Sequence, residues 1–226
     1  MANEITLPSR PKTIQIDLKR TAVIVVDMQN AFVSERGMFA LSGINVSGTQ
    51  TIIEPCKNVI SAARERDCKV IYLRHAYNTD LSDSGGENSP NWYKELGLVL
   101  LRERPDLKDV GLIDGTWGAE IIEELKPPEG SIVVRKQRFS GFAGTNLDFV
   151  LKTNNIKYLV FVGVATNVCV ETTIRDAYSH DYFPILISDG VSHAGKDFLQ
   201  DATIFNVKFA LGWVVDSKGF CDSLRK

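Results

Sequence analysis

The chain has 226 residues, of which 44% are hydrophobic and 24% charged, a composition typical of a globular protein that buries its own core. Its 26 basic and 28 acidic residues give a formal net charge of -2, without the basic excess of a nucleic-acid-binding protein. No apolar run is long enough to span a bilayer, and the first residues do not resemble a signal peptide. We therefore expect a cytoplasmic protein with no nucleic-acid or membrane partner.

Short apolar runs alternate with helical patterns along the chain. The runs are apolar throughout, as in strands covered on both faces, and we expect strands at 21–27, 69–73, 131–134, 158–162, 184–187 and 213–215. Helical periodicity predicts helices at 50–66, 119–125, 147–154, 168–180 and 197–211. The polar stretch 76–90 predicts a loop, a candidate lid.

This alternation predicts a three-layer αβα fold with an open, mainly parallel six-stranded sheet. We expect one domain over residues 19–226, preceded by an extended arm over residues 1–18.

Three reactive side chains follow predicted strands and should meet at the carboxyl edge of the sheet, where open α/β sheets bind ligands. Asp27 ends the first strand, Lys136 follows the third, and Cys169 follows the fourth. Thr166 or Asn167 would cap the helix that begins beside Cys169. The helix N-terminus and the Lys136 ammonium should then lower the pKa of the Cys169 thiol.

Each of these residues also has an ordinary structural interpretation. Cys169 is equally well interpreted as a buried structural cysteine, and Asp27 as a capping or loop hydrogen-bonding carboxylate. For a single lysine such as Lys136, a solvated surface position is the favoured interpretation. The three together are more specific than any one of them, with Asp27 as the base, Cys169 as the nucleophile and Lys136 as the cation that stabilises the thiolate and the oxyanion.

Several motifs carry a family resemblance. Residues 25–30 (VVDMQN), residues 140–142 (SGF) after Lys136, and residues 163–170 (GVATNVCV) resemble those of the isochorismatase-like cysteine hydrolases. The resemblance extends from about Thr21 to the last helix. It implies a six-stranded parallel sheet and a homo-oligomer.

The resemblance also implies the roles of particular residues. Asp27, Lys136 and Cys169 would form a catalytic triad, and the peptide before Ala165 would be cis. The N–H groups of Ala165 and Cys169 would bind the oxyanion. The implied reaction cleaves an amide-like C–N bond of a small ureido or carbamoyl compound, without a cofactor.

The substrate is less narrowly defined. Residues 138–142, 169–176 and 212–213 are similar to those of family members that hydrolyse ureidoacrylate in pyrimidine breakdown, whereas other members act on biuret, triuret, N-carbamoylsarcosine or nicotinamide. A substrate carboxylate requires a partner such as a guanidinium. We expect a pocket formed by Arg138, Phe139, Tyr77, Asn78 and Trp92.

Two other functions remain open. Nicotinamidases bind a metal through an Asp and two His after the second strand, but here only His75, Asp80 and Asp83 are available, so we expect no metal. Isochorismatases proper lack the cysteine, so Cys169 argues against that activity. A non-catalytic protein that binds a small ligand with the same fold is the remaining alternative.

Overall fold

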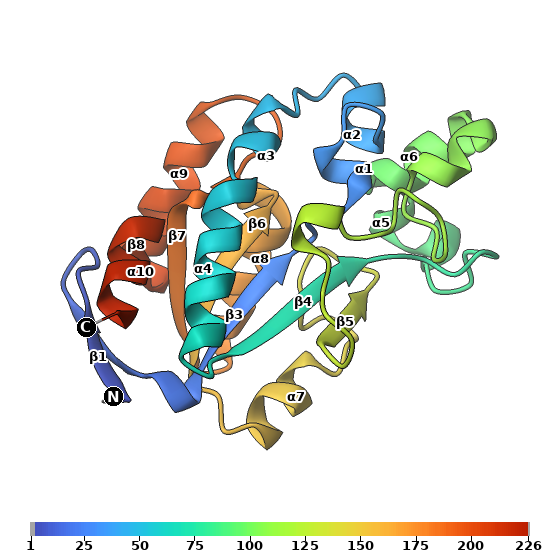
Figure 1. The fold of residues 1–226 in the computed structure, drawn as a ribbon. Coiled ribbons are helices and arrows are strands. Elements are labelled where there is room, and N and C mark those ends of the chain that lie inside the picture. The colour runs from blue at the N-terminus through green and yellow to red at the C-terminus, as the bar shows by residue number, and fades with distance from the viewer. Residues whose placement is uncertain (1–2, 226) are drawn as a thin grey trace.

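A computed structural model describes residues 3–225; residues 1, 2 and 226, which belong to the predicted arm and domain, lie outside the described residues. Its centre is a six-stranded sheet in the order β5-β4-β3-β6-β7-β8 (Figure 1). Every neighbouring pair of strands is parallel, which confirms the predicted sheet. The strands are β3 (Thr21–Val26), β4 (Lys69–His75), β5 (Ile132–Lys136), β6 (Tyr158–Val164), β7 (Phe183–Ser192) and β8 (Trp213–Val215).

Helices cover both faces of the sheet, as Figure 1 shows for α4 in front of β3. The central strand β3 is buried at every position, and its side chains alternate between two cores. Val23 and Val25 pack with α4 (Ile53–Glu65) and α10 (Ser217–Leu224). Ala22, Ile24 and Val26 pack with α7 (Leu147–Thr153) and α8 (Glu171–Ser179), and α9 (Phe198–Asn206) precedes the last strand. This two-sided burial explains why the strand sequences are apolar throughout.

The helix predicted at 119–125 is wrong, because only the short 3₁₀ turn η4 (Glu123–Leu125) forms there. The preceding backbone pairs instead with the loop after β3. The N–H of Asn30 donates to the Glu120 carbonyl at 2.9 Å, and the N–H of Ile122 donates to the Met28 carbonyl at 3.0 Å. Pairing with a distant segment has overridden the local helical pattern.

Several short elements were not predicted, and most of them lie in the segments that follow β3 and β4. Before β4 they are η1 (Leu18–Arg20), α1 (Asn30–Val33), α2 (Met38–Leu41) and α3 (Ser47–Thr51). After β4 they are η2 (Gly86–Asn88), α5 (Pro90–Lys94), α6 (Leu96–Glu103) and η3 (Pro105–Val110). The segment 76–90 is mainly loop, and α9 is followed by the π-helical turn η6 (Val207–Leu211).

Within the segment predicted as an extended arm, β1 (Glu4–Leu7) and β2 (Ile14–Asp17) form an antiparallel pair. Leu7 and Ile16 are buried in the core beside α10. Between the two strands, Arg10 pairs with Val214 on the outer edge of β8, with hydrogen bonds of 2.8 and 3.0 Å. None of the helices between residues 3 and 225 is both long and apolar enough to cross a membrane.

Candidate active site

Asp27, Lys136 and Cys169 meet at the carboxyl edge of the sheet. Lys136 Nζ lies 2.7 Å from Asp27 Oδ2, with both side chains almost completely buried. The same nitrogen donates to Cys169 Sγ at 3.5 Å and to the Arg138 carbonyl at 3.1 Å. The ammonium therefore makes two hydrogen bonds and forms an ion pair with the Asp27 carboxylate. Cys169 itself is only 5% exposed.

Cys169 lies in a π-helical turn, η5 (Thr166–Val170), that leads into α8. The Val164–Ala165 peptide bond is cis, as the resemblance implies. The predicted side-chain cap is wrong: the turn begins at Ala165, with no side chain bonded to its first N–H groups. Asn167 instead exchanges hydrogen bonds with the backbone of Ala194, at 2.9 and 3.0 Å.

The loop after β3 is held in place by Gln29, a residue for which no role was predicted. Asp27 leaves the sheet with a φ of 49°, a left-handed conformation that Asp tolerates. Two residues later, the completely buried Gln29 amide accepts the N–H of His75 and donates to its carbonyl, both at 2.8 Å. It also donates to the Ala119 carbonyl at 2.9 Å. Gln29 therefore extends the β3–β4 pairing beyond the sheet.

Burial controls the ionisation of the three side chains. Burial raises the pKa of the Cys169 thiol far above its usual value, because the opposing charge of Lys136 does not compensate for the loss of water. The predicted lowering of this pKa is thus wrong for the enclosed site. Burial also raises the pKa of Asp27, against the effect of Lys136, and makes its carboxylate a stronger base. The pKa of Lys136 is raised, since Asp27 and Cys169 outweigh its own burial.

A second buried chain of polar groups adjoins these residues. One ring nitrogen of His75 lies within 4.8 Å of a carboxylate oxygen of Asp27 and of Cys169 Sγ. His75 Nε2 is 3.0 Å from the Tyr77 hydroxyl, which also accepts the Asn91 amide at 2.9 Å. Burial and the charges of nearby cations lower the pKa of His75 well below its usual value, so its imidazole is neutral.

The predicted pocket residues lie in different surroundings. Tyr77 contacts the buried His75, and the Arg138 carbonyl accepts a hydrogen bond from Lys136. Phe139 is partly buried against the core cluster that contains Cys169. Asn78 accepts a hydrogen bond from Arg135 at 3.0 Å, and the Trp92 ring lies under the Arg102 guanidinium at 4.6 Å.

The residues considered for a metal site do not come together. His75 lies beside Asp27 and Cys169. Asp83 instead pairs with Arg135 at 3.3 Å, and Asp80 accepts hydrogen bonds from neighbouring Ser82 in an exposed turn. Among residues 3–225, the cluster of Asp27, His75 and Cys169 is the one group of possible metal ligands, and the Lys136 ammonium lies against two of its members.

The parallel sheet and the buried polar cluster at its carboxyl edge define a three-layer α/β protein with its site at that edge. An isochorismatase domain matches residues 21–219, so the chain belongs to the isochorismatase family. This confirms the family that the sequence motifs predicted.

Similar proteins of known sequence and structure agree with this assignment. Ureidoacrylate amidohydrolase RutB of Agrobacterium fabrum is 45% identical, covering 96% of this chain and 95% of the relative. The protein of the same name from Rhizobium rhizogenes is 43% identical, covering 97% of this chain and 89% of the relative. The crystal structure of a cysteine hydrolase from Pseudomonas syringae pv. phaseolicola superimposes with a TM-score of 0.76, at 29% identity, over 93% of this chain and 94% of that chain.

Proposed function

We propose that the protein is a cysteine-dependent amidohydrolase that cleaves ureidoacrylate in pyrimidine breakdown. The protein is a hydrolase of C–N bonds in linear amides, and the substrate is suggested by the RutB relatives at 45% and 43% identity. The observation that carries the proposal is the contact of the Cys169 thiol with the buried Lys136–Asp27 pair. The enzyme would act in the cytoplasm as a homo-oligomer.

In the first step, Asp27 takes the proton of Cys169 while Sγ attacks the ureido carbonyl carbon. Because the resting thiol is neutral, proton transfer and S–C bond formation occur together, and a carboxylate made more basic by burial suits this role. The oxyanion is stabilised by the N–H groups of Ala165 and Cys169 and by the Lys136 ammonium. In support, the Ala165 N–H donates no hydrogen bond to any group of residues 3–225.

In the second step, the tetrahedral intermediate collapses. Asp27 returns the proton to the departing nitrogen as the C–N bond breaks, which releases aminoacrylate and leaves a carbamoyl thioester on Cys169. Water then attacks the thioester carbonyl, and Asp27 takes its proton. Asp27 passes this proton to the departing sulfur, so that carbamate is released and the thiol is restored.

Arg138 is the proposed partner of the substrate carboxylate. Its guanidinium donates to the backbone carbonyls of Gln137 and Asp83, at 2.7 and 3.5 Å. No carboxylate of the described chain lies within ion-pair distance of it, so its charge is free for an anionic ligand. We expect Arg138→Gln to raise KM about tenfold or more for ureidoacrylate. The KM for biuret, which has no carboxylate, should stay unchanged, and an equal rise for both compounds would argue against this role.

The decisive experiment compares two cysteines of equal exposure. Cys169 and Cys221 are each 5% exposed. We expect Cys169→Ser to abolish carbamate release, while Cys221→Ser keeps the activity of the natural protein, with both variants folded by circular dichroism. Full activity in Cys169→Ser would reject the mechanism.

A substrate panel separates the remaining alternatives. Ureidoacrylate, biuret, triuret, N-carbamoylsarcosine and nicotinamide are compared by kcat/KM for nitrogen release. Preference for biuret or N-carbamoylsarcosine would keep the mechanism and replace the substrate. Binding without turnover of any compound would favour the non-catalytic alternative.

Because Cys169 is nearly enclosed, neighbouring side chains must move to admit a substrate.

A further inference from the structure

Thr173 joins the two segments that carry Lys136 and Cys169. It lies one turn after Cys169 and is completely buried. Its hydroxyl donates to the Cys169 carbonyl at 2.6 Å, and the same oxygen accepts the N–H of Gly141 at 3.0 Å. Gly141 belongs to the loop that follows Lys136. One hydroxyl therefore connects the turn of the cysteine with the loop of the lysine.

The bond to the Cys169 carbonyl would have no special meaning alone. Helical threonines often donate to the carbonyl four residues earlier, as exposed Thr153 does to Phe149 at 2.9 Å. Thr173 differs because its oxygen is also the acceptor for a buried backbone donor from a distant segment. A buried N–H that loses its partner is costly, so this hydrogen bond favours one position of the loop against α8.

A second contact reinforces the first on the same face of α8. Asp176, three residues after Thr173, accepts the Ser140 hydroxyl at 2.5 Å. Between the two contacts the loop passes very close to its neighbours: a Cβ added at Gly141 would lie 2.6 Å from the Leu73 side chain and 3.2 Å from that of Thr173. The loop is thus held to α8 by the side chains of Thr173 and Asp176, which lie about one helical turn apart on the same face.

The position of the loop determines the position of the ammonium. Lys136 Nζ donates to the Arg138 carbonyl within this loop, and it contacts Cys169 Sγ at the start of α8. A shift of the loop along α8 would change the Nζ–Sγ distance. We propose that Thr173 is a positioning residue, whose hydroxyl fixes the separation of the Lys136 ammonium and the Cys169 thiol. This inference rests on the proposed function, in which Cys169 is the nucleophile.

The test compares an isosteric variant with a conservative one. Thr173→Val removes the hydroxyl and keeps the shape, and we expect kcat to fall about tenfold or more, with KM changed less than about twofold. Thr173→Ser keeps the hydroxyl and should retain most of kcat. Thr153→Val, the same substitution at an exposed helical position, is the matched control and should leave kcat unchanged.

Two further measurements do not depend on turnover. Hydrogen exchange of the 137–146 segment should accelerate in Thr173→Val, and the iodoacetamide reactivity of Cys169 should change relative to that of Cys56 in the same digest. The activity of Cys169→Ser tests the proposed function separately, so failure of that function can be distinguished from failure of this inference.

The inference is overturned if Thr173→Val releases the loop and keeps full kcat, or if Thr173→Ser is as impaired as Thr173→Val. If Thr173→Val does not fold, Asp176→Ala replaces it, because this variant removes the partly exposed contact with Ser140 on the same loop. We expect Asp176→Ala to lower kcat about threefold or more, and a variant with full kcat would again overturn the inference.

Discussion

Neighbouring charged residues of β4 and β5 lie in opposite environments, buried on one face of the sheet and partly exposed on the other. Arg74 pairs across the sheet with Arg135, and His75 pairs with Lys136 in the next register position. His75 and Lys136 are almost completely buried beside Asp27. The adjacent arginines remain partly exposed on the opposite face.

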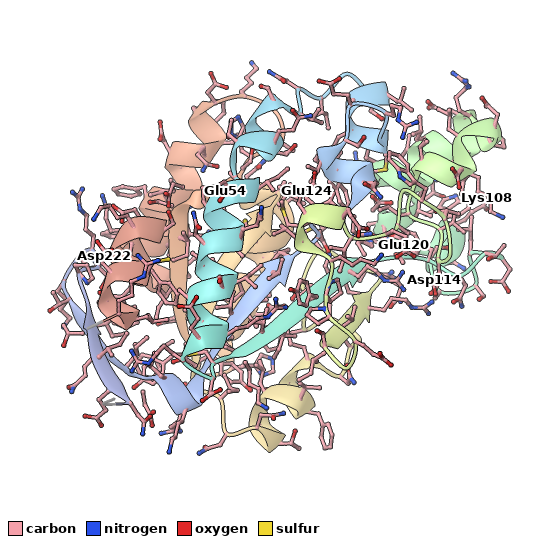
Figure 2. All side chains as sticks on the ribbon, in the orientation of Figure 1. Glu54, Lys108, Asp114, Glu120, Glu124 and Asp222 are labelled. Atoms are coloured by element: carbon pink, nitrogen blue, oxygen red, sulfur yellow. The ribbon has the colours of Figure 1, made fainter. Side chains whose placement is uncertain are left out.

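Arg74 and Arg135 share Asp114, at 2.6 and 3.1 Å, and Arg74 also lies 3.7 Å from Glu120. Figure 2 shows Asp114 and Glu120 beside the carboxyl end of β4. Successive side chains of a strand point to opposite faces, so a shift of one residue separates a candidate catalytic group from a structural ion pair. The charges of one face are shielded from water, whereas those of the other face are partly exposed.

The largest expected difference between the faces is in activity. Lys136→Met removes the ammonium beside the thiol, and we expect kcat/KM to fall about 100-fold or more. Arg135→Met removes a cation one residue away and should leave kcat/KM within about threefold, because the partly exposed arginine pairs on the other face. Steady-state kinetics on both variants make the comparison, and equal losses would remove the distinction between the faces.

Stability should show the same contrast. Lys136→Met leaves the Asp27 carboxylate buried without its cation, which should cost about 3 to 5 kcal/mol of the free energy of unfolding. The double variant Asp27→Asn/Lys136→Met should regain much of this loss, because both charges are absent. Arg135→Met should cost about 1 kcal/mol or less. Urea unfolding measures all three, and a double variant no more stable than Lys136→Met would contradict the expected energetic coupling of the two charges.

The pH dependence of alkylation tests how the enclosed site affects the ionisation of Cys169. Because burial raises the pKa of Cys169, its thiolate fraction at pH 7 should lie far below that of an ordinary thiol. We expect iodoacetamide to label Cys169 about tenfold or more slowly than the unfolded chain, with a rate that still rises above about pH 9. Peptide-resolved mass spectrometry gives the rate, and a plateau below about pH 8 would show an ionised resting thiol instead.

The smallest effect on stability is expected for Asp114, on the partly exposed face. Partial burial raises the pKa of Asp114, but the hydrogen bonds and charges of Arg74 and Arg135 lower it by more, so the folded value lies below the usual one. This group therefore adds stability above about pH 4, and the contribution is lost as the pH falls through the folded pKa. Asp114→Asn should lose less than about 1 kcal/mol at pH 6 and show no deficit near pH 2. Urea titrations at both values check the sign.

The sequence could predict the sheet and the meeting of three residues, because both follow from local pattern. Strands covered on both faces are apolar throughout, and the carboxyl ends of parallel strands converge wherever the helices lie. This was sufficient for Asp27, Lys136 and Cys169. The predicted direction of the pKa shift of the Cys169 thiol was wrong, because the sequence does not show how completely Cys169 is enclosed.

Interactions between distant segments account for the other errors. Residues 119–122 have a helical pattern, but their backbone pairs with the loop after β3, a contact that no local window contains. Gln29 and Thr173 were missed for the same reason, since each acquires its role from a partner far away in the chain. The motif around residues 25–30 contained Gln29, and its position two residues after a candidate base could have identified it.

The pairing of Arg10 with Val214 has a consequence for solubility. Strand β8 is the outer strand of the sheet, and its outward-facing backbone groups at Val214 are satisfied by Arg10. An unprotected outer strand is a template for aggregation with other chains. A version of the chain that starts at Thr21 should therefore keep its sheet but form aggregates on concentration, which light scattering would detect.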